Sequence, residues 1–343
     1  MNSTSAAGRI TAMIGKVDAD PRSGEVLWRM RSDDGRVDLT HGDPTRQFFI
    51  ASATKLYVTA ILAQLRDEGR VDWDRPLATY VPDLDLTGLV VVGGRDRTQD
   101  MTVREVLAHT SGLADYFEGT RPDGPTTFAR VVEEDFGWDV RDVLQWTRTM
   151  KPGTPGKGLY SDTGYQLLGA AIEAVDGRPF AESVRARISG PLGLIGTYCF
   201  SPLDVDHYGD VAALRYGPTR LRIPRAMASV QADGGMVSTL QDGLTFLGAR
   251  LFARSTLDEM QRDWHRIFFP LEYGTGLMRL RMSPLMTGFR RVPPFVGHSG
   301  ASGTVMFRAP ELGLTVVGTV NQVKHRSMPY QLMVRATNAA RGR

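Results

Sequence analysis

A serine and a lysine lie three residues apart in FFIASATKLYVTAILAQLRDEG, residues 48–69. Apolar residues recur here at helical spacing: Leu56, Ile61, Leu62 and Leu65. They predict a helix that starts close to Ser52 and ends at Gly69. Residues three apart share a helix face, so Ser52 and Lys55 are expected to lie side by side. A serine hydroxyl is a weak nucleophile until a base takes its proton, and a neighbouring cation helps the oxygen to carry charge. The pattern therefore offers a nucleophile together with its activator.

The same tetrapeptide also fits a simpler interpretation, in which a serine caps the helix and the lysine lies at the surface. Apolar residues on both sides of Ser52 favour a buried helix instead. An unpaired lysine in a buried helix is costly. Lys55 is therefore expected to have a partner or a catalytic purpose.

Two further segments carry groups that can do chemistry. GLYSDTGY, residues 158–165, holds two hydroxyls, Tyr160 and Ser161, followed by Asp162 at the entrance to a predicted helix. VGHSGASG, residues 296–303, places a histidine among small residues that let another group approach the backbone closely. Local sequence leaves simpler alternatives open, a helix cap for the first segment and a tight turn for the second.

Other kinds of site have little support. The Gly-x-Ser-x-Gly pattern is absent, which counts against an α/β-hydrolase. HExxH is absent, and the histidines outside residues 296–303 are too dispersed to suggest a metal cluster. The single cysteine, Cys199, excludes an internal disulfide. We expect neither a metal nor another cofactor.

Strands are predicted near both ends of the chain and helices between them. The predicted strands are 9–17, 25–30, 277–282, 304–308 and 314–320, and a closing helix is predicted over 327–340. In the middle, Thr102-Val-Arg-Glu105 forms a capping box for a helix that stops at 111–112. Further helices are predicted over 163–175 and from Ser238 onward.

This order predicts an α+β fold, in which an antiparallel sheet closed by the two chain ends receives a mainly helical insertion. We expect residues 1–75 and 205–343 to form the discontinuous sheet domain and residues 76–204 the helical subdomain. The active site is expected in the cleft between them.

Composition narrows the class of partner. The 343 residues are 42% hydrophobic and 23% charged, with a net charge of +3, and the arginines are scattered among acids. Such a mixed surface argues against a nucleic-acid patch. The N-terminus lacks a signal-peptide pattern and no run of 18 apolar residues occurs, so we expect a cytoplasmic protein with no membrane partner.

Taken together, the three segments resemble the penicilloyl serine hydrolases, a superfamily of serine β-lactamases, DD-peptidases, D-aminopeptidases and related esterases. The family order is Ser-x-x-Lys, Tyr-x-Asn and Lys/His-Thr/Ser-Gly; here it is SATK at 52–55, YSD at 160–162 and HSG at 298–300. Segments 101–113, 151–169, 188–197 and 232–242 look like family segments as well. The frame around Tyr160 resembles the class C and family VIII esterase-like branch. SDT at 161–163 also permits a class A alignment, but we favour Tyr160.

The resemblance implies an antiparallel sheet flanked by helices, an all-α subdomain and an acyl-enzyme on Ser52. It implies that Lys55 hydrogen-bonds Ser52 and that Tyr160 is the general base. The backbone N–H groups of Ser52 and Ala301 would form the oxyanion hole. The expected substrate-binding residues are Asp162, His298, Ser299 and Gly300. His109, in the segment AHTSG, is interpreted as structural.

Two positions depart from the family pattern. Asp162 replaces the usual asparagine and is expected to pair with Lys55, to receive a substrate ammonium, or to cap the following helix. His298 replaces the lysine that helps to recognise the carboxylate of penicillins. Because a histidine is mostly neutral, we expect an anionic substrate to bind less well. We therefore expect an intracellular carboxylesterase or amidase acting on a small ester or amide. The alternatives are a D-aminopeptidase or DD-peptidase, a weak β-lactamase, or a catalytically silent ligand-binding or sensor domain.

Overall fold

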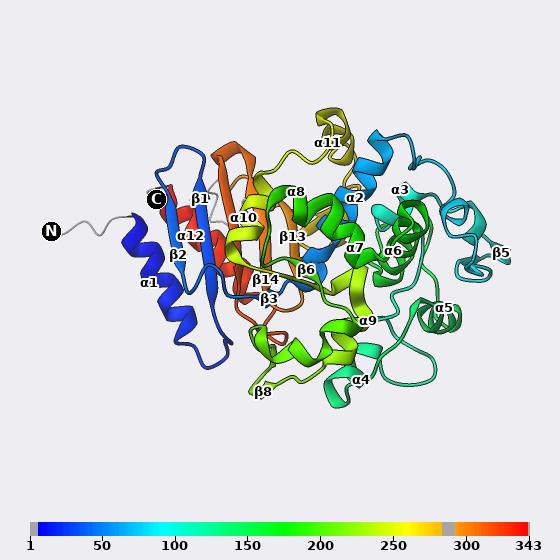
Figure 1. Ribbon diagram of the computed structural model, residues 1–343, viewed down its shortest axis with the longest axis horizontal. Helices are drawn as coiled ribbons and strands as arrows, with labels where there is room; N and C mark the ends of the chain where they lie inside the picture. Colours follow the sequence, from blue (N-terminus) through cyan, green and yellow to red (C-terminus); the bar gives the residue numbers. More distant parts are fainter. Residues whose placement is uncertain (1–5, 283–291, 342–343) are drawn as a thin grey trace.

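The computed structural model describes residues 6–282 and 292–341. Its centre is an eight-stranded antiparallel sheet in the order β10-β11-β12-β13-β14-β15-β1-β2 (Figure 1). The strands are β1 (Leu27–Ser32), β2 (Asp38–His41), β10 (His265–Phe268), β11 (Leu271–Tyr273), β12 (Met278–Leu280), β13 (Phe295–Gly300), β14 (Thr304–Ala309) and β15 (Leu314–Thr319). Because β1 pairs with β15, the two ends of the chain close one sheet, as the α+β prediction requires.

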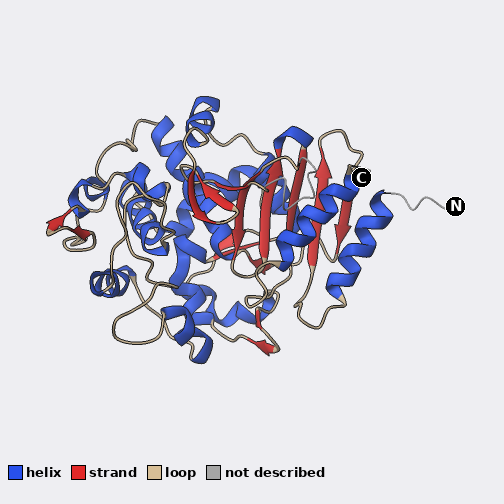
Figure 2. Ribbon diagram, turned by 180° about the vertical axis from the view of Figure 1, so that it is seen from behind, coloured by secondary structure: helices blue, strands red, loops and turns tan. Residues whose placement is uncertain are grey.

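Helices cover both faces of this sheet. Helices α1 (Ala6–Asp18) and α12 (Met328–Ala340) lie side by side over one face, near the two chain ends (Figure 2). Helix α10 (Leu240–Gly248) contacts β1, β14 and β15 from the other face. Neighbouring residues of β15 therefore enter different cores, since Val316 packs with the α1–α12 side and Val317 with the α10 side. Burial on both faces explains why β15 is apolar without alternation.

The predicted strand over 9–17 is wrong, because this segment forms α1. Ile10 and Ile14 are buried on the helix, and Met13 and Val17 pack partly against the same core. These positions follow the i, i+3, i+4, i+7 spacing of a helix face and not the two-residue period of a strand. The apolar run was short enough for both interpretations, and packing against α12 selects the helix.

The other predicted elements are present with adjusted ends. The β14–β15 hairpin and α12 are confirmed, and β12 lies within the predicted strand over 277–282. The Thr102–Glu105 capping box opens α3 (Val103–Leu107), which ends earlier than predicted. Helix α6 (Asp162–Asp176) is confirmed, and α10 is capped by Thr239 and not by Ser238.

The remaining helices and short strands lie outside the eight-stranded sheet and its α1–α12 layer. The helices are α2 (Lys55–Asp67), α4 (Thr127–Glu133), α5 (Val140–Thr149), α7 (Phe180–Val184), α8 (Gly190–Leu192), α9 (Pro224–Gly234) and α11 (Arg254–Met260). A second sheet has three short strands, β3 (Phe48–Phe49), β9 (Met236–Ser238) and β6 (Tyr198–Cys199). Two further pairs of strands are β4 (Val91–Val92) with β5 (Arg95–Asp96), and β7 (Arg215–Tyr216) with β8 (Thr219–Arg220). Single turns include η1 (Ala51–Thr54) and η2 (Leu77–Tyr80).

Helix α2 joins the sheet to the helical part of the molecule. Every residue from Lys55 to Ala63 is buried, as expected for a helix enclosed on all sides. It contacts β13 on one side and α6 and α9 on the other (Figure 1). The first residue of this apolar helix is a lysine, and that lysine marks the candidate site. The domain boundaries proposed above stay a prediction.

Candidate active site

Ser52 and Lys55 lie at the junction of η1 and α2. Ser52 is half-buried in the single turn η1, and Lys55 is the first residue of α2. Ala51, just before the serine, has φ +46°, a left-handed conformation that is unusual for a residue with a side chain. Such strained residues occur at sites that must present a group in one orientation. Ser52 also lies in a first turn, where backbone N–H groups have no partner within the helix.

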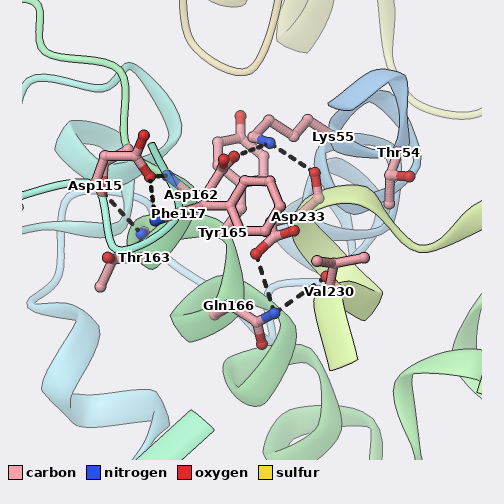
Figure 3. Close-up of polar contacts among 12 residues, drawn as sticks. Thr54, Lys55, Asp115, Phe117, Asp162, Thr163, Tyr165, Gln166, Val230 and Asp233 are labelled. Atoms are coloured by element: carbon pink, nitrogen blue, oxygen red, sulfur yellow. Dashed lines mark hydrogen bonds and ion pairs between the residues drawn. The ribbon is translucent and has the colours of Figure 1, made fainter. Parts of the chain in front are cut away.

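The Lys55 ammonium is completely buried and is held by two oxygens (Figure 3). Its Nζ donates to Asp162 Oδ1 at 2.6 Å and to the Asp233 backbone carbonyl at 2.7 Å. The ion pair expected between Lys55 and Asp162 is therefore present. The hydrogen bonds found among the described residues do not include the expected one between Lys55 and Ser52. Because an ammonium has three donors, one N–H of Lys55 is left for that contact.

Asp162 is not the cap of α6. Ser161 is the N-cap residue, and its hydroxyl accepts the Gly164 N–H at 3.4 Å. The Ser161 hydroxyl also donates to the Ala114 carbonyl at 2.9 Å. The capping interpretation of Asp162 is therefore wrong, while its interpretation as a partner of Lys55 agrees with the structure.

Tyr160 lies over Lys55. The Lys55 nitrogen is 5.0 Å from the centre of the Tyr160 ring and 5.1 Å from the centre of the Tyr165 ring. Burial and the nearby charge of Asp162 raise the pKa of Tyr160 well above its usual value of 10, against an opposing hydrogen bond with Ser52. Tyr160 is therefore a neutral phenol at physiological pH.

Two further carboxyl groups, which the sequence did not indicate, adjoin this pair. Asp115 Oδ1 accepts the backbone N–H of Asp162 at 3.2 Å and that of Phe117 at 3.1 Å (Figure 3). Asp233 Oδ2 accepts the Tyr116 hydroxyl at 2.8 Å and the Gln166 amide at 3.0 Å. Burial and the charge of Asp162 raise the pKa of Asp115 to about 8 and that of Asp233 well above its usual range. Three acids thus meet near Lys55: Asp162 binds it through its carboxylate, Asp233 through its backbone carbonyl, and Asp115 binds the backbone of Asp162.

The raised pKa of Asp115 makes protein stability depend on pH. Between its ordinary pKa of 3.8 and about 8, the folded protein keeps a proton that the unfolded chain has lost. This contribution to the free energy of unfolding is complete below pH 3.8 and is lost as the pH rises through 8. We expect Asp162→Asn to shift that loss to lower pH, because the charge of Asp162 helps to raise the pKa of Asp115.

Urea unfolding of wild type and Asp162→Asn between pH 5 and pH 9 measures this shift, with Asp115→Asn as the variant that lacks the titrating group. Wild-type and Asp162→Asn curves that stay parallel across the whole range would contradict the coupling between the two acids.

The turn after β13 approaches η1 closely. A Cβ atom at Gly300 would lie 2.1 Å from the Ile50 carbonyl oxygen, so a glycine is required there. Ala301 follows at once and is half-buried, and no acceptor for its backbone N–H is found among the described residues. The close contact thus places the end of β13 against the segment that carries Ser52, and the oxyanion hole expected from the Ser52 and Ala301 N–H groups stays a prediction.

His298 and Ser299 lie differently from what a substrate contact requires. His298 is fully buried; its Nδ1–H donates to the Ser299 carbonyl at 2.6 Å, and its Nε2 accepts from the Tyr273 hydroxyl at 2.9 Å. Burial and the charge of Lys55 lower the pKa of His298 to about 3, so the imidazole is neutral. The Ser299 hydroxyl is bonded to the Tyr330 hydroxyl of α12. The two side chains thus lie on opposite faces of the sheet, with the neutral His298 on the side of Lys55 and Tyr160 and Ser299 on the side of α12.

The described residues contain no group of three or more His, Cys, Asp or Glu side chains that could hold a metal ion. None of the helices described is both long enough and apolar enough to cross a membrane. What the site does offer is a serine hydroxyl, a buried ammonium and a phenol at one junction. Such a set can perform nucleophilic acyl transfer.

Comparison with known proteins agrees with this chemistry. Esterase EstB of Burkholderia gladioli is 28% identical over 197 residues, covering 53% of this chain and 46% of that protein. A putative D-alanyl-D-alanine carboxypeptidase of Escherichia coli K12 is 30% identical over 157 residues, covering 45% of this chain and 34% of that protein. The matched segments therefore span less than half the length of these relatives.

Solved structures match over nearly the whole chain. The D-stereospecific amidohydrolase of Streptomyces sp. has a TM-score of 0.72 at 26% identity, covering 93% of this chain and 95% of that one. The D-amino acid amidase of Ochrobactrum anthropi SV3 has a TM-score of 0.76 at 23% identity, covering 97% and 99%. The α+β fold is thus the one these enzymes share. The family model described as Beta-lactamase matches residues 22–338. Because that match includes every residue of the candidate site, the chain belongs to the β-lactamase family.

Proposed function

We propose that the protein is a serine hydrolase that cleaves a small ester or amide through an acyl-enzyme on Ser52. The observation that carries this proposal is the completely buried Lys55, which is held by Asp162 and by the Asp233 carbonyl next to a half-buried serine. A buried ion pair contributes little net stability compared with well-packed apolar residues. Its presence beside a nucleophile therefore supports a catalytic role.

The state of Tyr160 suggests how the proton moves. Because Tyr160 rests as a phenol, it accepts the Ser52 proton only as it gives up its own. As Ser52 Oγ bonds to the carbonyl carbon, the serine proton passes to the Tyr160 oxygen and the phenol proton passes to the leaving oxygen or nitrogen. The Ser52 and Ala301 N–H groups receive the carbonyl oxygen as it gains negative charge. Water then attacks the acyl-enzyme and gives its proton to the Tyr160 oxygen. The Tyr160 proton returns to Ser52, and the acid is released. Tyr160 acts here as a proton relay and not as a resting phenolate.

The charges of the site favour a substrate that carries an amine. Asp162 is engaged by Lys55, but the half-buried Asp115 is protonated at neutral pH, and a nearby cation would favour its ionisation. His298 stays neutral and supplies no charge for a carboxylate. The D-amino acid amidase and D-stereospecific amidohydrolase to which the chain is similar suggest the same class, an amino acid amide or ester.

A matched pair of amides tests this substrate class. We expect kcat/KM for phenylalanine amide, measured with both enantiomers, to exceed that for 3-phenylpropionamide, which lacks only the amine, by at least about 10-fold (roughly 1.4 kcal/mol). Asp115→Asn should reduce this ratio while leaving hydrolysis of a neutral p-nitrophenyl ester within a few-fold of wild type. Equal rates for the two amides would exclude amine recognition without excluding the hydrolase.

Intact-protein mass spectrometry after incubation with an activated ester tests the hydrolase itself. An acyl adduct together with turnover supports it, whereas no adduct and no turnover across a broad panel supports a silent ligand-binding domain. Turnover of benzylpenicillin or a D-alanyl-D-alanine peptide in preference to neutral esters would favour the β-lactamase or DD-peptidase alternative. The cytoplasmic location stays a prediction, which fractionation of the native cells would test.

A further inference from the structure

His109 lies next to the proposed proton relay in a strained conformation. It follows α3 in the segment AHTSG, is buried, and has φ +56°. Histidine enters this left-handed region more readily than most residues, but the conformation still costs free energy. A residue with a strained backbone is held in the core by its contacts. The His109 ring lies against the rings of Tyr160, Tyr165 and Tyr273, and its hydrogen bonds reach both neighbours of Tyr160.

Two hydrogen bonds from His109 hold the backbone on both sides of Tyr160. The Leu159 N–H donates to the His109 carbonyl at 2.8 Å, and the Ser161 N–H donates to His109 Nδ1 at 3.2 Å. The imidazole also lies against the phenol, with 4.3 Å between ring centres and 36° between the planes. One residue thus fixes the amide before Tyr160, the amide after it, and the ring itself.

The protonation state of His109 fits this arrangement. Because Nδ1 accepts a backbone N–H, the proton of the neutral imidazole is on Nε2. Burial and the nearby charge of Lys55 lower the pKa of His109 well below 6.5, so Nδ1 stays an acceptor at physiological pH. Nε2 has no hydrogen-bond partner within the described part of the chain. Leaving a buried donor without a partner costs about 1–3 kcal/mol, which the other contacts of His109 must offset.

We propose that His109 is a positioning residue that holds the phenol of Tyr160 at the distance from Ser52 at which a proton can pass. This inference rests on the proposed hydrolase activity and adds to it a residue that touches no reacting atom. Because a catalytic group displaced by about 1 Å can lose 10²-fold in rate, a clamp on the tyrosine backbone and ring acts directly on the acylation step.

Two variants separate positioning from folding. His109→Asn keeps a residue that tolerates the left-handed conformation but removes the ring. His109→Gly removes the strain as well and leaves space for free imidazole. Val103→Ala, in α3, is the matched control because Val103 is fully buried close by in sequence and has no described hydrogen bond or ring contact with Tyr160. It should lower thermal stability without changing the chemistry.

The measurement is the single-turnover rate of acylation by an activated ester, at a temperature where all variants are folded. We expect His109→Asn and His109→Gly to acylate about 10–100-fold more slowly with little change in KM, and imidazole to restore part of the rate in His109→Gly alone. Val103→Ala should acylate within a few-fold of wild type.

The outcomes separate a failure of the His109 positioning role from a failure of the proposed hydrolase activity. If wild type acylates and His109→Asn acylates at the same rate, the positioning role is wrong and the hydrolase stands. The role is equally wrong if acylation in the His109 variants falls only as far as in Val103→Ala, or if KM rises while kcat stays constant. If wild type forms no adduct, the proposed hydrolase fails, and the positioning role fails with it.

Discussion

Ser52→Ala is expected to abolish turnover of every substrate, with kcat/KM falling by at least about 10⁴-fold. The methyl group cannot form the acyl bond, and the remaining oxyanion donors alone give only weak catalysis. The same variant should show no mass increase with an activated ester. Its fold should survive within about 1 kcal/mol, since Ser52 is half-buried and the substitution removes only a hydroxyl group.

Ser161→Ala is the matched control for this prediction. Ser161 is the other serine beside the site, and losing its cap on α6 should cost about 1 kcal/mol of stability. It should still form the adduct. An adduct that survives in Ser52→Ala but disappears in Ser161→Ala would overturn the assignment of the nucleophile.

Lys55→Met should have the second largest effect, because it removes both the activating cation and the partner of a buried acid. We expect acylation to fall by at least about 10³-fold, within the usual range for an activating general acid or base. The free energy of unfolding should fall by about 3–5 kcal/mol, the usual result when one member of a buried ion pair is removed. Without the lysine, Asp162 must be protonated to remain buried, so the loss of stability should grow as the pH rises above 3.8, the ordinary pKa of this carboxyl group.

A double-mutant cycle in urea tests the origin of that loss. Adding Asp162→Asn to Lys55→Met should recover part of the stability, since the neutral amide no longer needs a cation. It should recover none of the activity. Full additivity of the two substitutions, or a Lys55→Met protein as stable as wild type at pH 8, would show that the pair does not stabilise the native state.

Local pattern was sufficient for most of the fold. The β14–β15 hairpin and helices α6 and α12 follow from apolar periodicity and turn residues, and the buried Lys55 was expected to have a partner. Segment 9–17 was misassigned because a run of nine residues fits a strand or a helix until its packing partner is known. Its partner, α12, is more than 300 residues away in the chain.

The two acids Asp115 and Asp233 are the part of the site that could not be predicted from the sequence. Asp115 comes from the loop after α3 and Asp233 from the end of α9, and each meets Lys55 or Asp162 only in the folded chain. No spacing or motif connects these positions. The resemblance identified the segment around Asp233 but gave the residue no role. His298 shows a second limit, because the motif singles out this residue, whereas its complete burial and its hydrogen bond with Tyr273 appear only in the folded chain.

The close approach of Gly300 to the Ile50 carbonyl has an evolutionary consequence. Any side chain at position 300 would force β13 and η1 apart and would separate the Ser52 and Ala301 N–H groups that we propose as the oxyanion hole. Random mutagenesis for new substrates is therefore expected to leave residue 300 unchanged, while the half-buried Ala301 beside it is freer to vary. New specificities would arise in the loops around this contact, and the contact itself would be inherited by every active descendant.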